Sequence, residues 1–208
     1  MIRNIVFDFG VILTGVDTKI CVAALDKIGL ARIGAYIGTS DKTGVCQELE
    51  LGNISPLEFC QQARDLCDRP DVTDNAIIDA WNTMITGVPV AKLRRLKELR
   101  DTGKYRIMML SNTNMIHWEK SVNDFFTMDG LTVDDYFDRI FLSCKMHLTK
   151  PDKAIFERML EQSGAIADET LFIDDSARNC EVAESLGIHT FYDPTGERFW
   201  DGALKVEG

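Results

Sequence analysis

Acidic and small polar residues stand near the ends of several short apolar runs in this chain. Asp8 closes the first run, Ser111-Asn112 follow another, Lys150 follows a third after a short loop, and Asp174-Asp175 follow a fourth. Carboxylates that share one cleft repel one another unless a cation lies among them. Lysine supplies a single positive charge to this set, and Mg²⁺ prefers oxygen ligands. The set therefore predicts a magnesium site.

The same residues could transfer a phosphoryl group. Asp8 could attack phosphorus as a carboxylate nucleophile and form an aspartyl-phosphate. Ser111 and Asn112 lie where a strand is expected to turn into a helix, and backbone N–H groups at such a turn can hold an anion. Lys150 and the metal would offset the charge of the phosphoryl group during transfer.

Each of these residues also has a purely structural interpretation. An Asp at the end of a strand is more often a cap or turn residue than a nucleophile, and Asp174-Asp175-Ser176 could simply cap a helix. Ser111-Asn112 is equally consistent with a turn, and Lys150-Pro151 with an ordinary helix start. All four features, in this order and each after an apolar run, are difficult to explain by capping alone.

Five short apolar segments are predicted to be strands, and they would bring these residues together. Most are apolar throughout, which is typical of strands covered on both faces. Helical patterns over Val90-Leu99, 152–162 and 177–186 separate the later strands. This alternation predicts an α/β fold whose parallel strands all end at one edge of the sheet. The predicted strands are Asn4-Phe9, Tyr105-Leu110, Arg139-Leu142, Thr170-Ile173 and His189-Tyr192.

The stretch from about residue 15 to 85 contains no clear strand and is predicted to be a helical insert. Asp17 can cap a first helix, Ser55 with Glu58 forms a capping-box pattern before a second, and Thr73 can start a third. An insert placed directly after the first strand lies above the carboxyl ends of the strands, where open α/β sheets bind ligands. The insert is therefore a candidate lid.

Composition narrows the class of protein further. The 208 residues are 45% hydrophobic and carry a formal net charge of −10, a balance that disfavours binding to nucleic acid. No apolar run is long enough to predict a membrane span, and no signal peptide is expected. The six cysteines form no CxxC pair. They predict free thiols in a reduced, cytoplasmic protein rather than zinc ligands.

The four motifs resemble those of the haloacid dehalogenase-like hydrolase superfamily, and the resemblance covers essentially the whole chain. It is carried by Phe7-Asp8-Phe9-Gly10-Val11, Leu110-Ser111-Asn112, Lys150-Pro151 and Ile173-Asp174-Asp175-Ser176. More narrowly, Ser111-Asn112-Thr113-Asn114 with the later lysine and acid pair resembles the bacterial α-D-glucose-1-phosphate phosphatase-like branch.

The resemblance implies a Rossmann-like three-layer core with a mainly parallel sheet, its first strand central. Residues 1–14 and 86–208 would form this core, and a small helical cap would occupy residues 15–85. The implied activity is Mg²⁺-dependent hydrolysis of a small phosphorylated metabolite, a sugar phosphate such as a hexose 1-phosphate, through an aspartyl-phosphate. Neither nucleic acid nor a membrane is an expected partner, and the protein would be a monomer or homodimer.

The resemblance also implies a role for each site residue. Asp8 would be the nucleophile and a metal ligand, and Lys150 would be catalytic. The Gly10 carbonyl and Asp175 would complete the protein ligands to Mg²⁺. Asp174 would act through water or through Lys150 rather than on the metal directly. Ser111 and the Asn112 backbone would hold the phosphate.

Gly10 is the departure from the pattern of most phosphatases of this superfamily, which have Asp at that position. That Asp protonates the leaving oxygen and later activates water, and losing such help costs on the order of 10²–10⁴-fold. An easy leaving group, such as an anomeric phosphate or an acyl phosphate, would suffer least. Asp17 and His117 could substitute, although Asp17 is more typical of a helix cap and His117 of a solvent-facing helix position.

Two other functions remain open at this point. A 2-haloacid dehalogenase also uses an aspartate nucleophile, but it needs no metal and typically lacks the paired acids found at Asp174-Asp175. A pseudo-enzyme that binds a phosphorylated ligand is favoured by Gly10 alone. Substrate contacts in the cap could involve Trp81, Asn82, Glu48 or Glu50, with a core position more typical of the tryptophan. The tail Arg198-Phe199-Trp200 is predicted to join the core.

Overall fold

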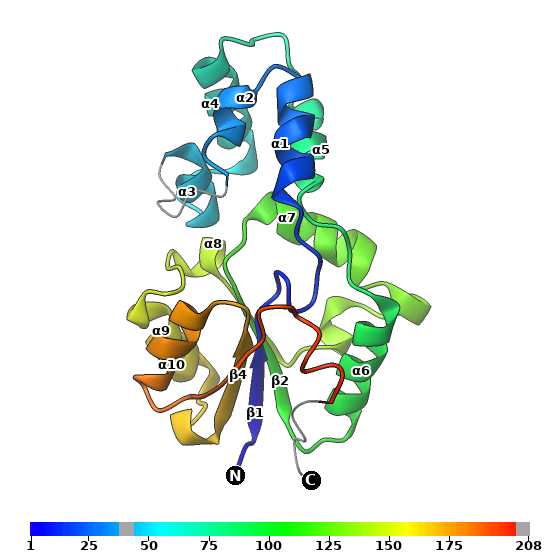
Figure 1. The fold of residues 1–208 in the computed structure, drawn as a ribbon, viewed down its shortest axis with the longest axis vertical. Helices are drawn as coiled ribbons and strands as arrows, with labels where there is room; N and C mark the ends of the chain where they lie inside the picture. The colour runs from blue at the N-terminus through cyan, green and yellow to red at the C-terminus, as the bar shows by residue number, and fades with distance from the viewer. Residues whose placement is uncertain (38–43, 203–208) are drawn as a thin grey trace.

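The computed structural model describes residues 1–37 and 44–202 and contains a five-stranded parallel sheet. The strand order is β3-β2-β1-β4-β5, so the first strand is central, as expected (Figure 1). All four neighbouring pairs are parallel, and the predicted α/β Rossmann-like fold is confirmed. The strands are β1 (Asn4–Phe7), β2 (Arg106–Ser111), β3 (Arg139–Leu142), β4 (Thr170–Asp174) and β5 (His189–Tyr192).

Side chains along each strand point alternately to the two faces of the sheet, and they form two separate apolar layers. Ile5 and Phe7 of β1 point into one layer, whereas Val6 points into the other. Because successive strand residues face opposite sides, a wholly buried strand supplies both layers at once. Helices α6 and α7 cover one face, and α9 and α10 cover the other (Figure 1). These helices are α6 (Val90–Asp101), α7 (Met115–Lys120), α9 (Lys153–Ser163) and α10 (Ala177–Glu184), and the short α8 (Ser143–Met146) directly follows β3.

Four shorter helical segments complete this part of the chain. A π-helix extends α7, two 3₁₀ turns precede the edge strand β3, and a third directly precedes β4. The segments are Ser121–Phe125, Met128–Gly130, Val133–Asp135 and Ala167–Glu169.

Five helices lie above the sheet and share an apolar cluster of their own (Figure 1). Ser55 makes the predicted capping box with Glu58, and Thr73 caps its helix as expected. We call these helices the cap. Ile116 of α7 also belongs to their cluster, so the cap packs on the sheet-bearing part through that helix. The cap helices are α1 (Thr18–Lys27), α2 (Ala31–Gly34), α3 (Val45–Glu50), α4 (Pro56–Cys67) and α5 (Asp74–Asn82).

Two connections join the cap to the rest of the chain, and they run side by side. Val16 forms an antiparallel bridge with Ile85, and the Thr86 N–H donates to the Gly15 carbonyl at 3.0 Å. The Thr14 hydroxyl donates to the Gly87 carbonyl at 3.0 Å. A Cβ on Gly15 would stand 2.2 Å from the Thr86 hydroxyl oxygen, so any larger residue there would force the Thr86 side chain to move.

Several boundaries differ from the sequence-based prediction. β1 ends at Phe7 rather than Phe9, while Ser111 and Asp174 are strand residues because their backbones continue the ladder. Pro151 was predicted in the first turn of a helix, but it precedes α9 by two residues and follows a cis peptide bond.

The predicted core position of the tail is confirmed, because Phe199 is buried and the Trp200 ring stacks on Phe7. All six cysteines are free thiols, and four of them are buried. None of the described helices combines the length and apolarity needed to cross a bilayer.

Candidate active site

Lys150 joins two carboxylates at the ends of the neighbouring strands β1 and β4. Its Nζ lies 2.7 Å from Asp8 Oδ1 and 2.6 Å from Asp174 Oδ2. The pairing of Phe7 with Ile173 places the following residue of each strand side by side, which brings the two acids together. All three side chains are almost completely buried. A charged group is rarely buried without a partner, and each charge here has one.

Burial and charge perturb the ionisation of this group strongly. Burial raises the pKa of Asp8 to about 7, and the neighbouring Asp174 and Asp175 carboxylates add to the rise although Lys150 opposes it. Burial also raises the pKa of Asp175, again with help from Asp174. Burial works against the charge of Lys150, but the two carboxylates outweigh it and raise the pKa of that ammonium. The cluster therefore has an excess of negative charge that a cation would relieve.

The carboxylates fit a magnesium ion. Asp8, Asp174 and Asp175 each offer one oxygen, and these oxygens lie within 4.8 Å of one another. Asp174 is already engaged, because Oδ1 accepts from the Ser176 N–H at 2.8 Å and from Asn179 Nδ2 at 2.9 Å while Oδ2 accepts from Lys150. Asp8 and Asp175 are thus the carboxylates with capacity for a metal, and an all-oxygen donor set suits Mg²⁺.

The second motif, Ser111-Asn112, lines the cavity and also holds the loop that carries Lys150. Ser111 is the buried last residue of β2. The Asn112 side chain donates to the Lys150 carbonyl and accepts from the Lys150 N–H, both at 2.8 Å. This pair of hydrogen bonds fixes the loop that carries the lysine. The Asn112 side chain is therefore occupied, and its backbone is the part left to contact an anion.

Gly10 lies two residues beyond Asp8 in a tight turn. Its carbonyl accepts from the Ile12 N–H at 2.5 Å. A Cβ on Gly10 would stand 3.5 Å from a Val16 methyl and 4.0 Å from Asp8 Oδ2, which are ordinary contacts. The absence of an acid at this position is therefore not imposed by lack of space.

The two candidate replacements for the missing acid are both committed elsewhere. Asp17 caps α1, and its Oδ1 accepts from the Lys19 and Ile20 N–H groups at 3.0 and 3.1 Å. His117 was expected to face solvent, but it is 6% exposed and stacks on Trp81 with ring centroids 5.6 Å apart. The prediction for His117 was wrong because this side of α7 is covered by the cap.

The hydrogen bonds of His117 fix its tautomer. Nε2 lies 3.0 Å from the Trp81 carbonyl, which can only accept, so Nε2 carries the proton. Nδ1 lies 3.2 Å from Asn114 Nδ2 and accepts from it. Burial lowers the pKa of His117 to about 4. The imidazole is therefore neutral near pH 7, and its one N–H is held by the Trp81 carbonyl rather than available to a leaving group.

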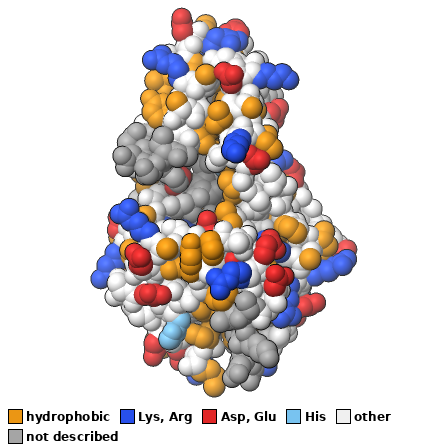
Figure 2. Space-filling view, in the orientation of Figure 1, with side chains coloured by type: hydrophobic (Ala, Val, Ile, Leu, Met, Phe, Trp, Pro, Cys, Tyr) orange, Lys and Arg blue, Asp and Glu red, His pale blue; other side chains and the backbone are white. Residues whose placement is uncertain are grey.

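A cavity of about 290 Å³ separates the cap from the strand ends. Figure 2 shows the molecule hollowed between these two parts. Trp81 and Glu50 line the cavity, whereas Glu48 and Asn82, which were also considered, do not. Three polar lining residues carried no sequence signal, because single Thr and Tyr residues in helices or loops are unremarkable in a pattern: Thr14, Thr18 and Tyr36.

The cap is seated on the sheet-bearing part by a shared hydroxyl. Ser143 Oγ lies 2.8 Å from the Glu50 carbonyl of the cap and 2.8 Å from the Thr113 carbonyl. It also accepts from the Thr113 N–H at 2.9 Å. Nearby, Gly52 approaches the Cys144 carbonyl so closely that a Cβ would stand 1.9 Å from the oxygen.

Fold and site together define an α/β enzyme whose buried acids need a cation. A protein-family model described as a haloacid dehalogenase-like hydrolase matches residues 2–187. The D-ribitol-5-phosphate phosphatase of Bacteroides thetaiotaomicron is 37% identical over 206 residues, which are 99% of this chain and 98% of that protein. The chain belongs to the haloacid dehalogenase-like hydrolase family.

Solved structures agree with this assignment. A haloacid dehalogenase family enzyme from B. thetaiotaomicron, crystallised with magnesium and inorganic phosphate, is 36% identical. It superposes with a TM-score of 0.91, covering 99% of this chain and 100% of that one. A predicted haloacid dehalogenase-like hydrolase from Porphyromonas gingivalis is 33% identical with a TM-score of 0.88, covering 98% and 96%. An L-2-haloacid dehalogenase at 17% identity and a TM-score of 0.58 shares the fold alone.

Proposed function

We propose that this protein is a Mg²⁺-dependent phosphatase that hydrolyses a small phosphorylated metabolite through an aspartyl-phosphate on Asp8. The observation that carries the proposal is the buried Asp8–Lys150–Asp174 bridge beside Asp175, an arrangement with surplus negative charge. Gly10, two residues after Asp8, lines the cavity. The relative that acts on D-ribitol 5-phosphate and the magnesium and phosphate bound to a 36% identical enzyme support it.

In this proposal the magnesium ion would be held by Asp8, the Gly10 carbonyl and Asp175. When bound, it supplies positive charge that offsets the phosphoryl oxygens. Asp8 attacks phosphorus, the ester P–O bond breaks, and the alcohol leaves. Water then attacks the phosphorus of the aspartyl-phosphate, which releases inorganic phosphate and regenerates the Asp8 carboxylate.

The remaining site residues prepare the phosphoryl group for this transfer. Lys150 lies against the nucleophile and offsets negative charge, and Asp174 holds the lysine in place. Ser111 and the Asn112 backbone hold the phosphate, since both line the cavity next to Gly10. Because no side-chain acid stands at position 10, water supplies the proton to the leaving oxygen.

A sugar phosphate or polyol phosphate is the proposed substrate class. The cavity of about 290 Å³ is small for a ligand site and has hydroxyl and carboxylate groups among apolar walls. The 37% identical relative from B. thetaiotaomicron is a phosphatase of D-ribitol 5-phosphate, a five-carbon polyol phosphate. The narrower assignment to hexose 1-phosphates stays a prediction, to be decided by the substrate panel below.

We also propose the division of the chain into a catalytic core of residues 1–14 and 86–208 and a cap of residues 15–85. The separate apolar cluster of α1–α5 and the paired connections support it; residues 38–43 and 203–208 lie outside the described part. The proposed setting is the cytoplasm, consistent with free thiols. The protein would act on its substrate as a monomer or homodimer, without nucleic acid or membrane.

A panel of phosphomonoesters tests the activity. It contains D-ribitol 5-phosphate, a hexose 1-phosphate and p-nitrophenyl phosphate, each assayed for phosphate release with Mg²⁺ and with EDTA. We expect Mg²⁺-dependent release that is lost in Asp8→Asn. Halide release from a 2-haloacid in the presence of EDTA would instead establish a dehalogenase, and tight phosphate-ester binding without turnover would establish a pseudo-enzyme.

A further inference from the structure

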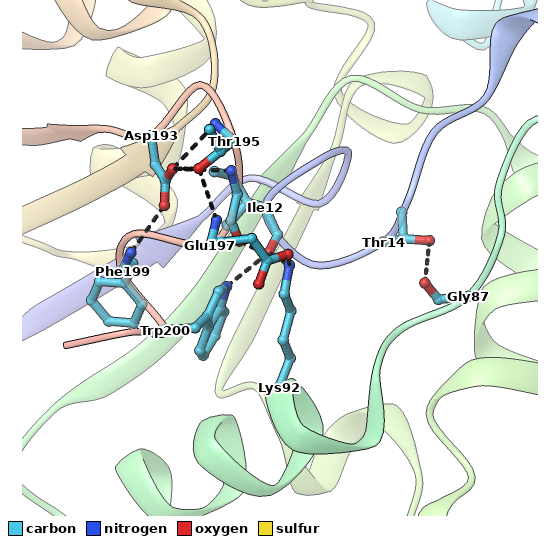
Figure 3. A network of polar contacts seen from close by, with 10 residues as sticks. Ile12, Thr14, Gly87, Lys92, Asp193, Thr195, Glu197, Phe199 and Trp200 are labelled. Carbon is cyan, nitrogen blue, oxygen red and sulfur yellow. Dashed lines mark hydrogen bonds and ion pairs between the residues drawn. The ribbon is translucent and has the colours of Figure 1, made fainter. Parts of the chain in front are cut away.

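Lys92 is a buried lysine outside the site described above. It is 5% exposed and lies in the first turn of α6. Its Nζ donates to the Ile12 carbonyl at 3.0 Å and to the Gly196 carbonyl at 2.8 Å, and lies 3.0 Å from Glu197 Oε1 (Figure 3). The ammonium thus joins the turn after the nucleophile to a loop near the end of the described chain.

Ile12 is the residue through which this contact reaches the site. Its carbonyl accepts from Lys92 and also from Trp200 Nε1, at 2.9 Å (Figure 3). Its N–H donates to the Gly10 carbonyl at 2.5 Å. Ile12 therefore connects a buried donor, Lys92, and a half-buried donor, Trp200, to the carbonyl proposed as a metal ligand. A shift of Ile12 would move Gly10 with it.

The turn does not hold this shape by local preference. Val11 has φ of 61°, in the left-handed region that β-branched residues avoid. With the Ile12 N–H on the Gly10 carbonyl, this is the hydrogen-bond pattern of a γ-turn around a left-handed central residue, which is rare and strained. Such a conformation persists only where surrounding contacts over-determine it.

The C-terminal loop supplies those contacts. The Asp193 carboxylate accepts from the Thr195 and Gly196 N–H groups on Oδ1 and from the Phe199 N–H on Oδ2 (Figure 3). This brings Gly196 so close to the turn that a Cβ would stand 2.0 Å from the Val11 carbonyl oxygen. The loop therefore lies directly on the turn, and position 196 has room for nothing larger than glycine.

From these contacts we propose that Lys92 and Trp200 are positioning residues for magnesium binding, which hold the strained Gly10–Ile12 turn in its working shape. The inference rests on the proposed function, since it assumes that Gly10 and Asp8 meet the metal. Partners of metal ligands that lie beyond the ligands themselves typically change metal affinity ~10–100-fold when mutated. Lys92 and Trp200 contact the proposed ligand Gly10 only through Ile12, so we expect a change in Mg²⁺ affinity at the lower end of that range.

Calorimetric titration with Mg²⁺ alone tests the proposal without requiring turnover. The variants are Lys92→Met, which keeps the side-chain length, and Lys92→Arg, which keeps donors. Lys97→Met on the same helix is the matched control, because Lys97 forms an ion pair with the exposed Asp101. We expect the Mg²⁺ dissociation constant to rise about tenfold in Lys92→Met, to recover within about threefold in Lys92→Arg, and to stay unchanged in the control.

A second variant protects the test against loss of folding. Trp200→Phe can keep the ring against Phe7 but removes the N–H that Ile12 accepts. We expect it to weaken Mg²⁺ binding severalfold and to lower kcat for p-nitrophenyl phosphate while KM changes less than about twofold. Wild-type Mg²⁺ affinity in folded Lys92→Met, or in Trp200→Phe if the former does not fold, overturns the proposal.

The titration separates this inference from the proposed function. A wild-type protein that binds Mg²⁺ but hydrolyses no phosphomonoester would refute the phosphatase, while the variants would still decide the role of Lys92. A wild-type protein that binds no Mg²⁺ would overturn both.

Discussion

Asp8 and Asp174 stand next to each other at the ends of adjacent parallel strands, and one buried ammonium lies within 2.7 Å of both. The ladder fixes this relationship, because Phe7 pairs with Ile173 and the two acids are the next residues. The backbone alone would force two carboxylates together at this edge. Lys150 makes that arrangement tolerable in the metal-free protein.

Removing the ammonium should therefore damage both stability and activity. We expect Lys150→Met to lower the free energy of unfolding by about 3–5 kcal/mol, because two buried carboxylates lose their partner. Activity should fall by at least ~10³-fold. Urea unfolding and steady-state kinetics measure the two effects. Lys120→Met is the control, since that lysine forms an exposed pair with Asp124; equal stability of the two variants would contradict the prediction.

Magnesium binding should depend on pH around neutrality. Burial raises the pKa of Asp8 to about 7 in the metal-free protein, so below pH 7 a proton competes with the metal for that carboxylate. The apparent Mg²⁺ dissociation constant should rise about tenfold per pH unit below 7 and level off above about 8. Titrations at pH 5.5 to 8.5 check this, and a flat profile would refute it.

The raised pKa of Asp8 also makes the stability of the metal-free protein depend on pH. A folded-state pKa above the unfolded value favours folding at low pH and loses that contribution as pH rises through about 7. Saturating Mg²⁺ should therefore raise the melting temperature more at pH 8 than at pH 5.5, as differential scanning fluorimetry would record.

Adding an acid at position 10 should help poor leaving groups most. The position has room for a side chain, and its Cβ would point within 4.0 Å of Asp8 Oδ2. We expect Gly10→Asp to raise kcat/KM for glycerol 3-phosphate relative to p-nitrophenyl phosphate by about 10²-fold. Gly10→Ala isolates the effect of the added Cβ. An unchanged ratio would mean that another group already donates the proton.

His117 should make the protein sensitive to acid. Burial lowers its pKa to about 4, below the ordinary value of 6.5. Stability from the neutral imidazole is therefore present above pH 6.5 and is lost as pH falls toward 4. Between pH 7.5 and 4.5 the wild type should lose about 2.5 kcal/mol more than His117→Gln in urea unfolding. Parallel pH profiles for the two proteins would contradict this.

The sheet was predictable from sequence because strands buried on both faces are apolar along their whole length. The acids at the strand ends were predictable because each follows such an apolar run. Ser55 and Thr73 were predictable as helix caps because a cap depends only on residues nearby in the sequence. The exact strand ends were not, since Ser111 and Asp174 continue the ladder through their backbones.

What escaped prediction depends on contacts between distant segments. α2 and α3 span one or two turns each, too short for a periodic pattern. His117 is buried by the cap rather than by its own helix, and Lys92 by carbonyl groups far away in the chain. No local pattern distinguishes Lys92 from the exposed basic residues Arg94 and Arg95 that follow it in α6.

The contact between Ile12 and Trp200 spans 188 positions of the chain. Proteins are synthesised from the N-terminus, so Asp8 and its turn leave the ribosome long before the loop that fixes them. The proposed nucleophile, Asp8, belongs to the first part of the protein to be made, and Trp200 lies in almost the last part described. The turn that carries the proposed metal ligand therefore gains its contact with Trp200 only after nearly all of the described chain has been made.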